Sequence, residues 1–122
     1  MSEMIQWNEY MSEIMARVKE LAQVAPETVK GFGALDSAAS KTNHLGPKVR
    51  ELIALAVAVT TRCDGCITVH TSEAVKHGAT KEEIAEALSV AIALNAGAAL
   101  VYSTRVLDAF AAKTEAVAAG SR

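Results

Sequence analysis

Apolar residues recur at intervals of three and four along nearly the whole chain, the spacing that puts them on one face of an α-helix. In the first such segment Met11, Ile14, Val18 and Leu21 form the apolar face, with charged residues between them. No stretch alternates apolar and polar residues for long enough to predict a β-strand. The pattern therefore predicts an all-α fold of about six helices, over residues 11–22, 26–35, 47–59, 63–77, 80–92 and 101–110.

Prolines and polar segments set several of the expected helix ends. Pro26 and Pro47 suit the first turn of a helix, because proline lacks the N–H group that this turn leaves unbonded. The polar segment 40–46 is expected to form a loop. Asn95 and Gly97 are expected to mark a break between the last two helices.

The middle of the chain carries the clearest helix signals. The helix expected over residues 47–59 is apolar nearly all round after Glu51, so it should lie at the centre of the fold. Gly78 is expected to end the following helix in the left-handed conformation. Thr80 and Glu83 have the spacing of a capping box and predict the start of the next helix.

Length and composition indicate one small domain that associates with copies of itself. The chain has 122 residues, and we expect a single domain over residues 1–122. Hydrophobic residues make up 51% of the chain and aromatic residues only 4%, because much of the apolar content is alanine. Alanine favours helix but buries little area. We therefore expect a homo-oligomer, since association buries surface that one copy leaves exposed.

The charge and hydropathy of the chain argue against two classes of binding partner, nucleic acids and membranes. The net charge is −2 and no basic face is present, which argues against nucleic-acid binding. The N-terminal segment lacks the pattern of a secretory signal, and the longest apolar runs, 52–59 and 90–94, look too short to span a membrane. We therefore expect a cytoplasmic protein with no membrane partner. In a reducing compartment, a close cysteine pair is more often catalytic or metal-binding than a structural disulfide.

The two cysteines, Cys63 and Cys66, form a pair suited to thiol chemistry. They are three residues apart, so on a helix their sulfur atoms share a face and can meet. Cys63 is expected at the helix N-terminus, where unbonded N–H groups and the helix dipole favour a thiolate. A thiolate is the attacking species, and the second cysteine can resolve the oxidised form of the first. Position alone therefore favours Cys63 as the more activated thiol.

His70 and Glu51 can serve this pair. His70 lies four residues after Cys66, one turn along the same face, where it can move a proton to or from that thiol. Glu51 lies at the edge of the most apolar helix, where a carboxylate needs a partner. The His70 imidazole would supply that partner directly or through water. Together these residues could supply a nucleophile (a cysteine), a base (His70) and an acid that orients the base (Glu51).

The glutamate, the two cysteines and the histidine form the motif E-x11-C-D-G-C-x3-H. This motif resembles the signature of AhpD-like alkylhydroperoxidases, which belong to the carboxymuconolactone decarboxylase superfamily. The resemblance covers about residues 47–110, including the apolar run before the motif and the segment GATKEEIAEAL after it. The chain departs from well-studied members between the cysteines, where they have a histidine and this chain has Asp64 and Gly65.

The resemblance implies a fold, an activity and a role for each site residue. It implies an all-α domain that assembles into trimers or hexamers and reduces hydroperoxides. Cys66 would attack the hydroperoxide and become the sulfenic acid, and Cys63 would act as proton donor and resolving thiol. His70 and Glu51 would relay protons. The reductant would be a dithiol carrier, either lipoyl or thioredoxin-like. No cofactor is implied, and no glycine-rich phosphate loop is present in the sequence.

Four other interpretations of the same residues stay open from the sequence. The cysteines could be two buried core residues without chemistry. The cysteines, His70 and Glu51 could instead bind zinc, although structural zinc sites usually show a second ligand pair. The superfamily name suggests a decarboxylase or a lactone-processing enzyme, which would not need two cysteines at this spacing. A non-enzymatic oligomeric scaffold is the fourth possibility.

Overall fold

The protein is all-α. A computed structural model describes residues 2–120, and within this range it contains five helices and no strand. The expected fold class is therefore confirmed, and the expected number of about six helices is one too high. The helices are α1 (Trp7–Val24), α2 (Pro26–Thr42), α3 (Pro47–Thr61), α4 (Asp64–Lys76) and α5 (Lys81–Gly120).

The expected break at Asn95 and Gly97 is wrong, because α5 continues through both residues as one helix of 40 residues. The Asn95 side chain stays inside the helix by donating to the Ala91 carbonyl at 2.7 Å and to the Thr60 hydroxyl of α3 at 2.9 Å. A single glycine costs a helix only about 1 kcal/mol relative to alanine, and alanines flank Gly97. The hydrogen bonds of Asn95 and the alanines beside Gly97 therefore keep α5 helical through both residues.

The loop expected over residues 40–46 is shorter in the structure, because α2 extends to Thr42. Ser40 and Thr42 remain helical by donating their hydroxyls to carbonyls one turn earlier in α2. Asn43 then ends the helix with a φ of 50°, in the left-handed region. The segment is polar because most of it is exposed to solvent, and its first residues are nevertheless helical.

The other expected helix ends are confirmed. Pro47 occupies the first turn of α3. Gly78 has a φ of 80°, which a residue without Cβ adopts at little cost. The Glu83 N–H donates to the Thr80 hydroxyl at 3.0 Å, and the Thr80 N–H donates to the Glu83 carboxylate at 2.9 Å. This reciprocal pair is the capping box expected from the sequence.

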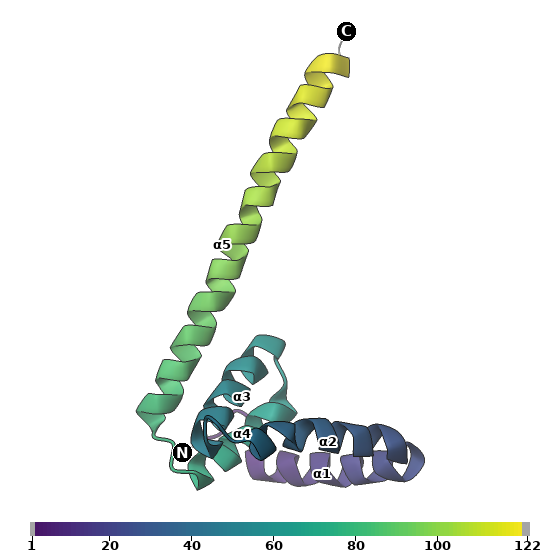
Figure 1. Ribbon diagram of the computed structural model, residues 1–122, viewed down its shortest axis with the longest axis vertical. Coiled ribbons are helices and arrows are strands. Elements are labelled where there is room, and N and C mark those ends of the chain that lie inside the picture. The colour runs from purple at the N-terminus through teal and green to yellow at the C-terminus, as the bar shows by residue number, and fades with distance from the viewer. Residues whose placement is uncertain (1, 121–122) are drawn as a thin grey trace.

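The small core gathers around α3, as its apolar sequence predicts. α3 packs against α4 and α5, and α1 packs against α2 and α4. Within the described part of the chain the buried hydrophobic residues are few and mostly alanine: Leu55, Ala58, Ala74 and Ala91. Figure 1 shows α1 and α2 lying side by side, with α3 and α4 at one end of the pair and α5 running away from them into open space.

α5 is long and apolar enough to cross a membrane, judged by length and composition alone. The expectation that every apolar run is too short for this is therefore wrong. It counted only uninterrupted apolar runs, whereas the helix stays uncharged through small and polar residues such as Asn95, Gly97 and Ser103. Residues 87–104 contain no Asp, Glu, Lys or Arg, and very little of this apolar surface is buried by the chain itself.

Candidate active site

The connection between α3 and α4 places Cys63 at the start of a helix. Arg62 ends α3 in the left-handed conformation with a φ of 54°. The Cys63 N–H then donates back to the Ala58 carbonyl at 3.0 Å, which turns the chain sharply into α4. Cys63 is the N-cap residue of α4, with extended backbone and a side chain that accepts from the helix. The expected position of Cys63 is confirmed.

The two thiols lie in contact. Cys63 and Cys66 are free, half-buried cysteines whose sulfur atoms are 2.8 Å apart. The Cys66 backbone N–H also donates to the Cys63 sulfur, at 3.2 Å. Cys63 can therefore accept from both the thiol and the amide of Cys66, and a negative charge on its sulfur is stabilised twice.

These contacts shift the pKa values of the two thiols in opposite directions. The pKa of Cys63 is lowered, first by the hydrogen bond from the Cys66 thiol and then by the Cys66 backbone N–H. The bond to Cys63, together with burial and the charges of Cys63 and Asp36, raises the pKa of Cys66 to about 11. The contact therefore favours negative charge on Cys63 and the proton on Cys66, as the helix N-terminus argument expects.

Replacing Cys66 with alanine is expected to move the pH at which Cys63 ionises upward. The change removes the thiol donor that contributes most to lowering the pKa of Cys63. The measurement is the rate of Cys63 alkylation by iodoacetamide as a function of pH. Cys66→Ser keeps a hydroxyl donor and serves as the matched control, with a smaller upward shift. Equal midpoints in all three reduced proteins would contradict this account of the pair.

Glu51 and His70 form a second pair between α3 and α4. The His70 Nδ1 atom lies 2.6 Å from a carboxylate oxygen of Glu51, so the partner expected for Glu51 is confirmed. The side chains are 18% exposed for Glu51 and 26% for His70, which keeps both within reach of solvent. A carboxylate on Nδ1 fixes the ring and directs Nε2 away from Glu51, where it can exchange a proton with another group.

The thiol pair and the carboxylate–imidazole pair are adjacent but separate. Over residues 2–120 the hydrogen bond of His70 is to Glu51 and not to either cysteine. In the same range no three His, Cys, Asp or Glu side chains gather closely enough to hold a metal ion. The arrangement therefore gives no support to the zinc interpretation.

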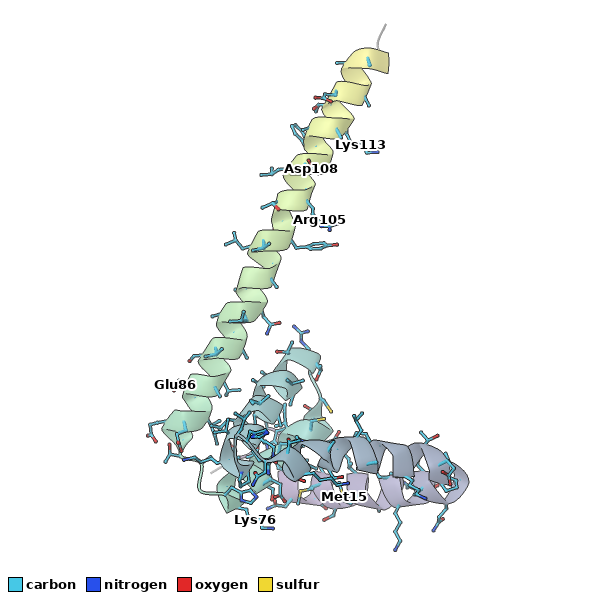
Figure 2. The ribbon with its side chains drawn as sticks, in the orientation of Figure 1. Met15, Lys76, Glu86, Arg105, Asp108 and Lys113 are labelled. Carbon is cyan, nitrogen blue, oxygen red and sulfur yellow. The ribbon has the colours of Figure 1, made fainter. Side chains whose placement is uncertain are left out.

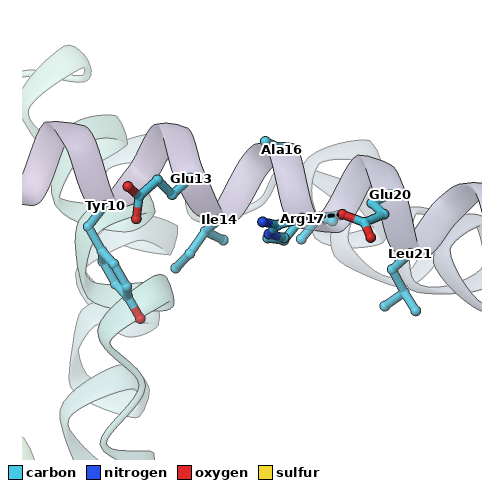
Figure 3. Close-up of a pocket in the computed structure, with 8 residues that line it drawn as sticks. Tyr10, Glu13, Ile14, Ala16, Arg17, Glu20 and Leu21 are labelled. Carbon is cyan, nitrogen blue, oxygen red and sulfur yellow. Dashed lines mark hydrogen bonds and ion pairs between the residues drawn. The ribbon is translucent and has the colours of Figure 1, made fainter.

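A cavity of about 650 Å³ opens beside the carboxylate–imidazole pair. Its walls come from the C-terminal half of α2, the start of α3 and one side of α4. They include Glu51, His70, Arg50 and His77. A larger groove of about 750 Å³ runs along α1, where Figure 3 shows Tyr10, Glu13, Arg17 and Glu20 among its side chains. Neither hollow is lined by a cysteine, but the cavity beside His70 contains the Glu51–His70 pair, so it is the better candidate for substrate entry.

Two residues of this region could not be identified from the sequence motif. Asp36 of α2 lines the cavity, and its charge helps to raise the pKa of Cys66. Ile14 of α1 lies so close that a Cβ at Gly65 would be 3.0 Å from its Cδ1 atom. Glycine at position 65 therefore leaves room for α1 to pack against this side of the cysteine pair. Neither residue has a local sequence signal, since each is about thirty or more residues away from the thiol it approaches.

A model of the Carboxymuconolactone decarboxylase family matches residues 26–109 of the chain. The chain belongs to this family. The match confirms the resemblance inferred from the motif, and it extends the region of similarity back to the start of α2. The family accounts for the all-α fold.

Several relatives show the same similarity over most of their length. An uncharacterized protein from Haemophilus influenzae is 50% identical over 104 residues, covering 85% of this chain and 92% of that protein. Another uncharacterized protein, from Cupriavidus necator, is 36% identical over 100 residues, covering 82% of this chain and 88% of that protein. The crystal structure of an apo carboxymuconolactone decarboxylase family protein from Legionella pneumophila superposes with a TM-score of 0.69 at 36% identity. That comparison covers 86% of this chain and 94% of the Legionella chain.

Proposed function

We propose that this family member is a thiol-dependent hydroperoxide reductase, an oxidoreductase that cycles between a dithiol and a disulfide in the cytoplasm. One observation carries the proposal: two free thiols lie in contact, and their shared hydrogen bond lowers the pKa of Cys63 and raises the pKa of Cys66. Such a pair combines a nucleophile, a proton donor and a resolving thiol within one turn of helix. The adjacent Glu51–His70 pair supplies the proton relay.

The reaction follows in balanced steps. A cysteine sulfur attacks the terminal oxygen of the hydroperoxide, the O–O bond breaks, and the alcohol leaves after taking a proton. The sulfur is oxidised to a sulfenic acid while the peroxide is reduced. The second cysteine then attacks this sulfur, an S–S bond forms, and water leaves.

We assign the attack to Cys66 and the resolution to Cys63, following the family resemblance. The 2.8 Å contact supports this assignment, because Cys66 can pass its proton to the Cys63 thiolate as it attacks. Cys63 then holds the proton that the departing alkoxide needs. His70, oriented by Glu51, exchanges protons with the pair from the cavity side.

Return to the dithiol form needs a reductant. We propose a dithiol carrier, either lipoyl or thioredoxin-like, whose two thiols are oxidised as the protein disulfide is reduced. Such carriers suit a reducing cytoplasm, where a disulfide formed by peroxide does not persist without turnover. We assign this exchange to Cys63, because it caps α4 and its pKa is the lowered one of the pair.

A decarboxylase or lactone-processing activity is the alternative. It rests on the family name and on Arg50, which lines the same cavity as Glu51 and His70. A guanidinium there could hold a substrate carboxylate. This chemistry would not require the cysteines, so turnover of a carboxylated lactone by a Cys63→Ser/Cys66→Ser variant would establish it instead of the reductase.

The test of the proposal is a count of free thiols. The reduced protein receives one equivalent of an organic hydroperoxide, and remaining thiols are titrated over time. Both thiols are expected to disappear together into one intramolecular disulfide, faster than free cysteine reacts, and to return on addition of dihydrolipoamide. Thiols that persist, or that react no faster than free cysteine, would overturn the proposal and favour the scaffold interpretation.

A further inference from the structure

The cavity beside His70 is larger and more apolar than a small inorganic peroxide requires. Its volume of about 650 Å³ is within the range of sites that hold organic ligands. Leu45, Ile53 and Val69 supply large apolar side chains to its wall. Leu45 is 59% exposed and Ile53 is 49% exposed, so both still have apolar surface that a ligand can cover. The cavity therefore suits a molecule with an apolar body.

Two of the three carboxylates in the cavity wall already have a partner. The Glu51 carboxylate lies 2.6 Å from the His70 imidazole, and the Glu73 carboxylate lies 3.5 Å from the His77 imidazole. All four side chains line the cavity. These acids are therefore not needed to balance any other charge of the cavity.

Arg50 brings a permanent positive charge to the same wall, and it forms no ion pair within residues 2–120. Its guanidinium donates to the side-chain oxygen of Asn43 at 2.6 Å. An amide oxygen is neutral, so this bond orients the guanidinium without balancing its charge. The Arg50 side chain is half-buried and keeps further N–H donors for a ligand.

The position of Arg50 near the start of α3 adds to this positive charge. The N-terminal end of a helix is partly positive, and the first turn of α3 contains no acidic residue. Lys48, the other cation at this end, is balanced by Glu83 at 2.8 Å. Figure 2 labels Lys76, the last residue of α4, among the packed helices and Asp108 far from it along α5, so that acid does not reach the cavity.

Asp36 places a negative charge at a different point of the cavity. It lines the wall from α2 and forms no ion pair within the described range 2–120. Its charge also acts on the Cys66 thiol, where it helps to raise the pKa. Asp36 lies seven residues before Asn43, the contact of Arg50, which is about 10 Å along the helix direction. The cavity is therefore positive at Arg50 and negative on the side nearer the thiols.

We propose that this cavity binds organic acids through Arg50 and that the substrates are hydroperoxides of such acids. The second part rests on the proposed reductase activity. A guanidinium can hold a carboxylate with two parallel hydrogen bonds, and Leu45 and Ile53 contact the apolar body of the ligand. The uncharged hydroperoxide group then lies on the side of His70, one helical turn from Cys66. Because Asp36 repels a carboxylate, the reverse orientation is disfavoured.

A carboxylate fits this cavity better than a phosphate monoester, the other anion that arginine commonly binds. A phosphate monoester carries close to two negative charges, whereas a carboxylate carries one. The wall contains three carboxyl groups, from Asp36, Glu51 and Glu73. Their repulsion is therefore larger for the phosphate, and the single unbalanced charge of Arg50 matches a single negative charge.

The first experiment measures binding to the reduced protein by NMR titration and needs no turnover. The probes are octanoate and octanamide, which have the same shape and differ in charge. Wild type is expected to bind octanoate about ten- to a hundred-fold more tightly, the range for hydrogen bonds to a charged group. Arg50→Gln is expected to bind the two probes equally.

Lys48→Gln is the matched control for this measurement. It removes the same charge two residues away, from a side chain that does not line the cavity, so the preference for octanoate should remain. Wild type that binds octanoate no better than octanamide, or not at all, would overturn the proposal. An equal loss of preference in both variants would also overturn it, because the effect would then come from net charge.

The second experiment compares kcat/KM for linoleic acid hydroperoxide and for its methyl ester. Wild type is expected to favour the acid about ten-fold or more, and Arg50→Gln should remove this preference by raising KM for the acid. Equal values for acid and ester in wild type would overturn the substrate class while leaving the reductase function in place. Octanoate binding through Arg50 by a protein that reduces neither hydroperoxide would confirm the organic-acid site and contradict the reductase function.

Discussion

Replacing Cys66 with serine is expected to abolish catalytic reduction of an organic hydroperoxide in the presence of dihydrolipoamide. The change removes the sulfur assigned to attack and the partner with which Cys63 forms a disulfide, so no cycle between dithiol and disulfide remains. The measurement is hydroperoxide consumption under turnover conditions. The rate of the variant should fall to the background given by the dithiol alone.

Cys63→Ser provides the comparison for this result. It leaves Cys66 in place without its resolving thiol, so one equivalent of peroxide is expected to stop at a sulfenic acid on Cys66. A dimedone adduct located by mass spectrometry identifies the oxidised residue. An adduct on Cys63 in Cys66→Ser, with none on Cys66 in Cys63→Ser, would reverse the two roles. Undiminished turnover by Cys66→Ser would contradict the redox cycle itself.

Replacing His70 with alanine is expected to slow disulfide formation on the order of 10²- to 10⁴-fold, the range that a positioned acid–base group contributes. The proton of Cys66 is held tightly, because its pKa is raised to about 11, so a relay that accepts protons matters most for this thiol. The measurement is the rate of thiol loss after one equivalent of hydroperoxide. Glu51→Gln should slow the same step less, since the imidazole remains but loses its charged partner.

His77→Ala is the matched control for the His70 variant. His77 follows α4, lies 3.5 Å from the Glu73 carboxylate, and lines the same cavity. Like His70, His77 lies beside a glutamate and lines this cavity. It is seven residues, about two helical turns, farther along the chain from the thiols. We expect its replacement to leave the rate within about two-fold of wild type. Equal slowing by His77→Ala and His70→Ala would show that the effect comes from the cavity and not from a proton relay.

Local rules account for what the sequence determined about this protein. Apolar spacing predicted helices throughout, and Thr80 with Glu83 predicted a helix start that the structure reproduces. The spacing of Cys63 and Cys66 predicted sulfur contact, and the helix N-terminus predicted the more acidic thiol. All of these features depend on residues within one or two turns of each other, so periodicity and capping were sufficient to identify them.

Other features depended on contacts between distant parts of the chain. Asn95 stays helical because Thr60, from another helix, accepts its hydrogen bond, and no local rule at Asn95 foresees this. Ile14 approaches Gly65 because α1 packs against α4, and the charge of Asp36 acts on Cys66 from α2, which packs against α1. The sequence alone supplied the residues of the site and their order. Tertiary structure decided the 2.6 Å Glu51–His70 contact, the cavity beside it and the exposed face of α5, because each depends on how whole helices pack.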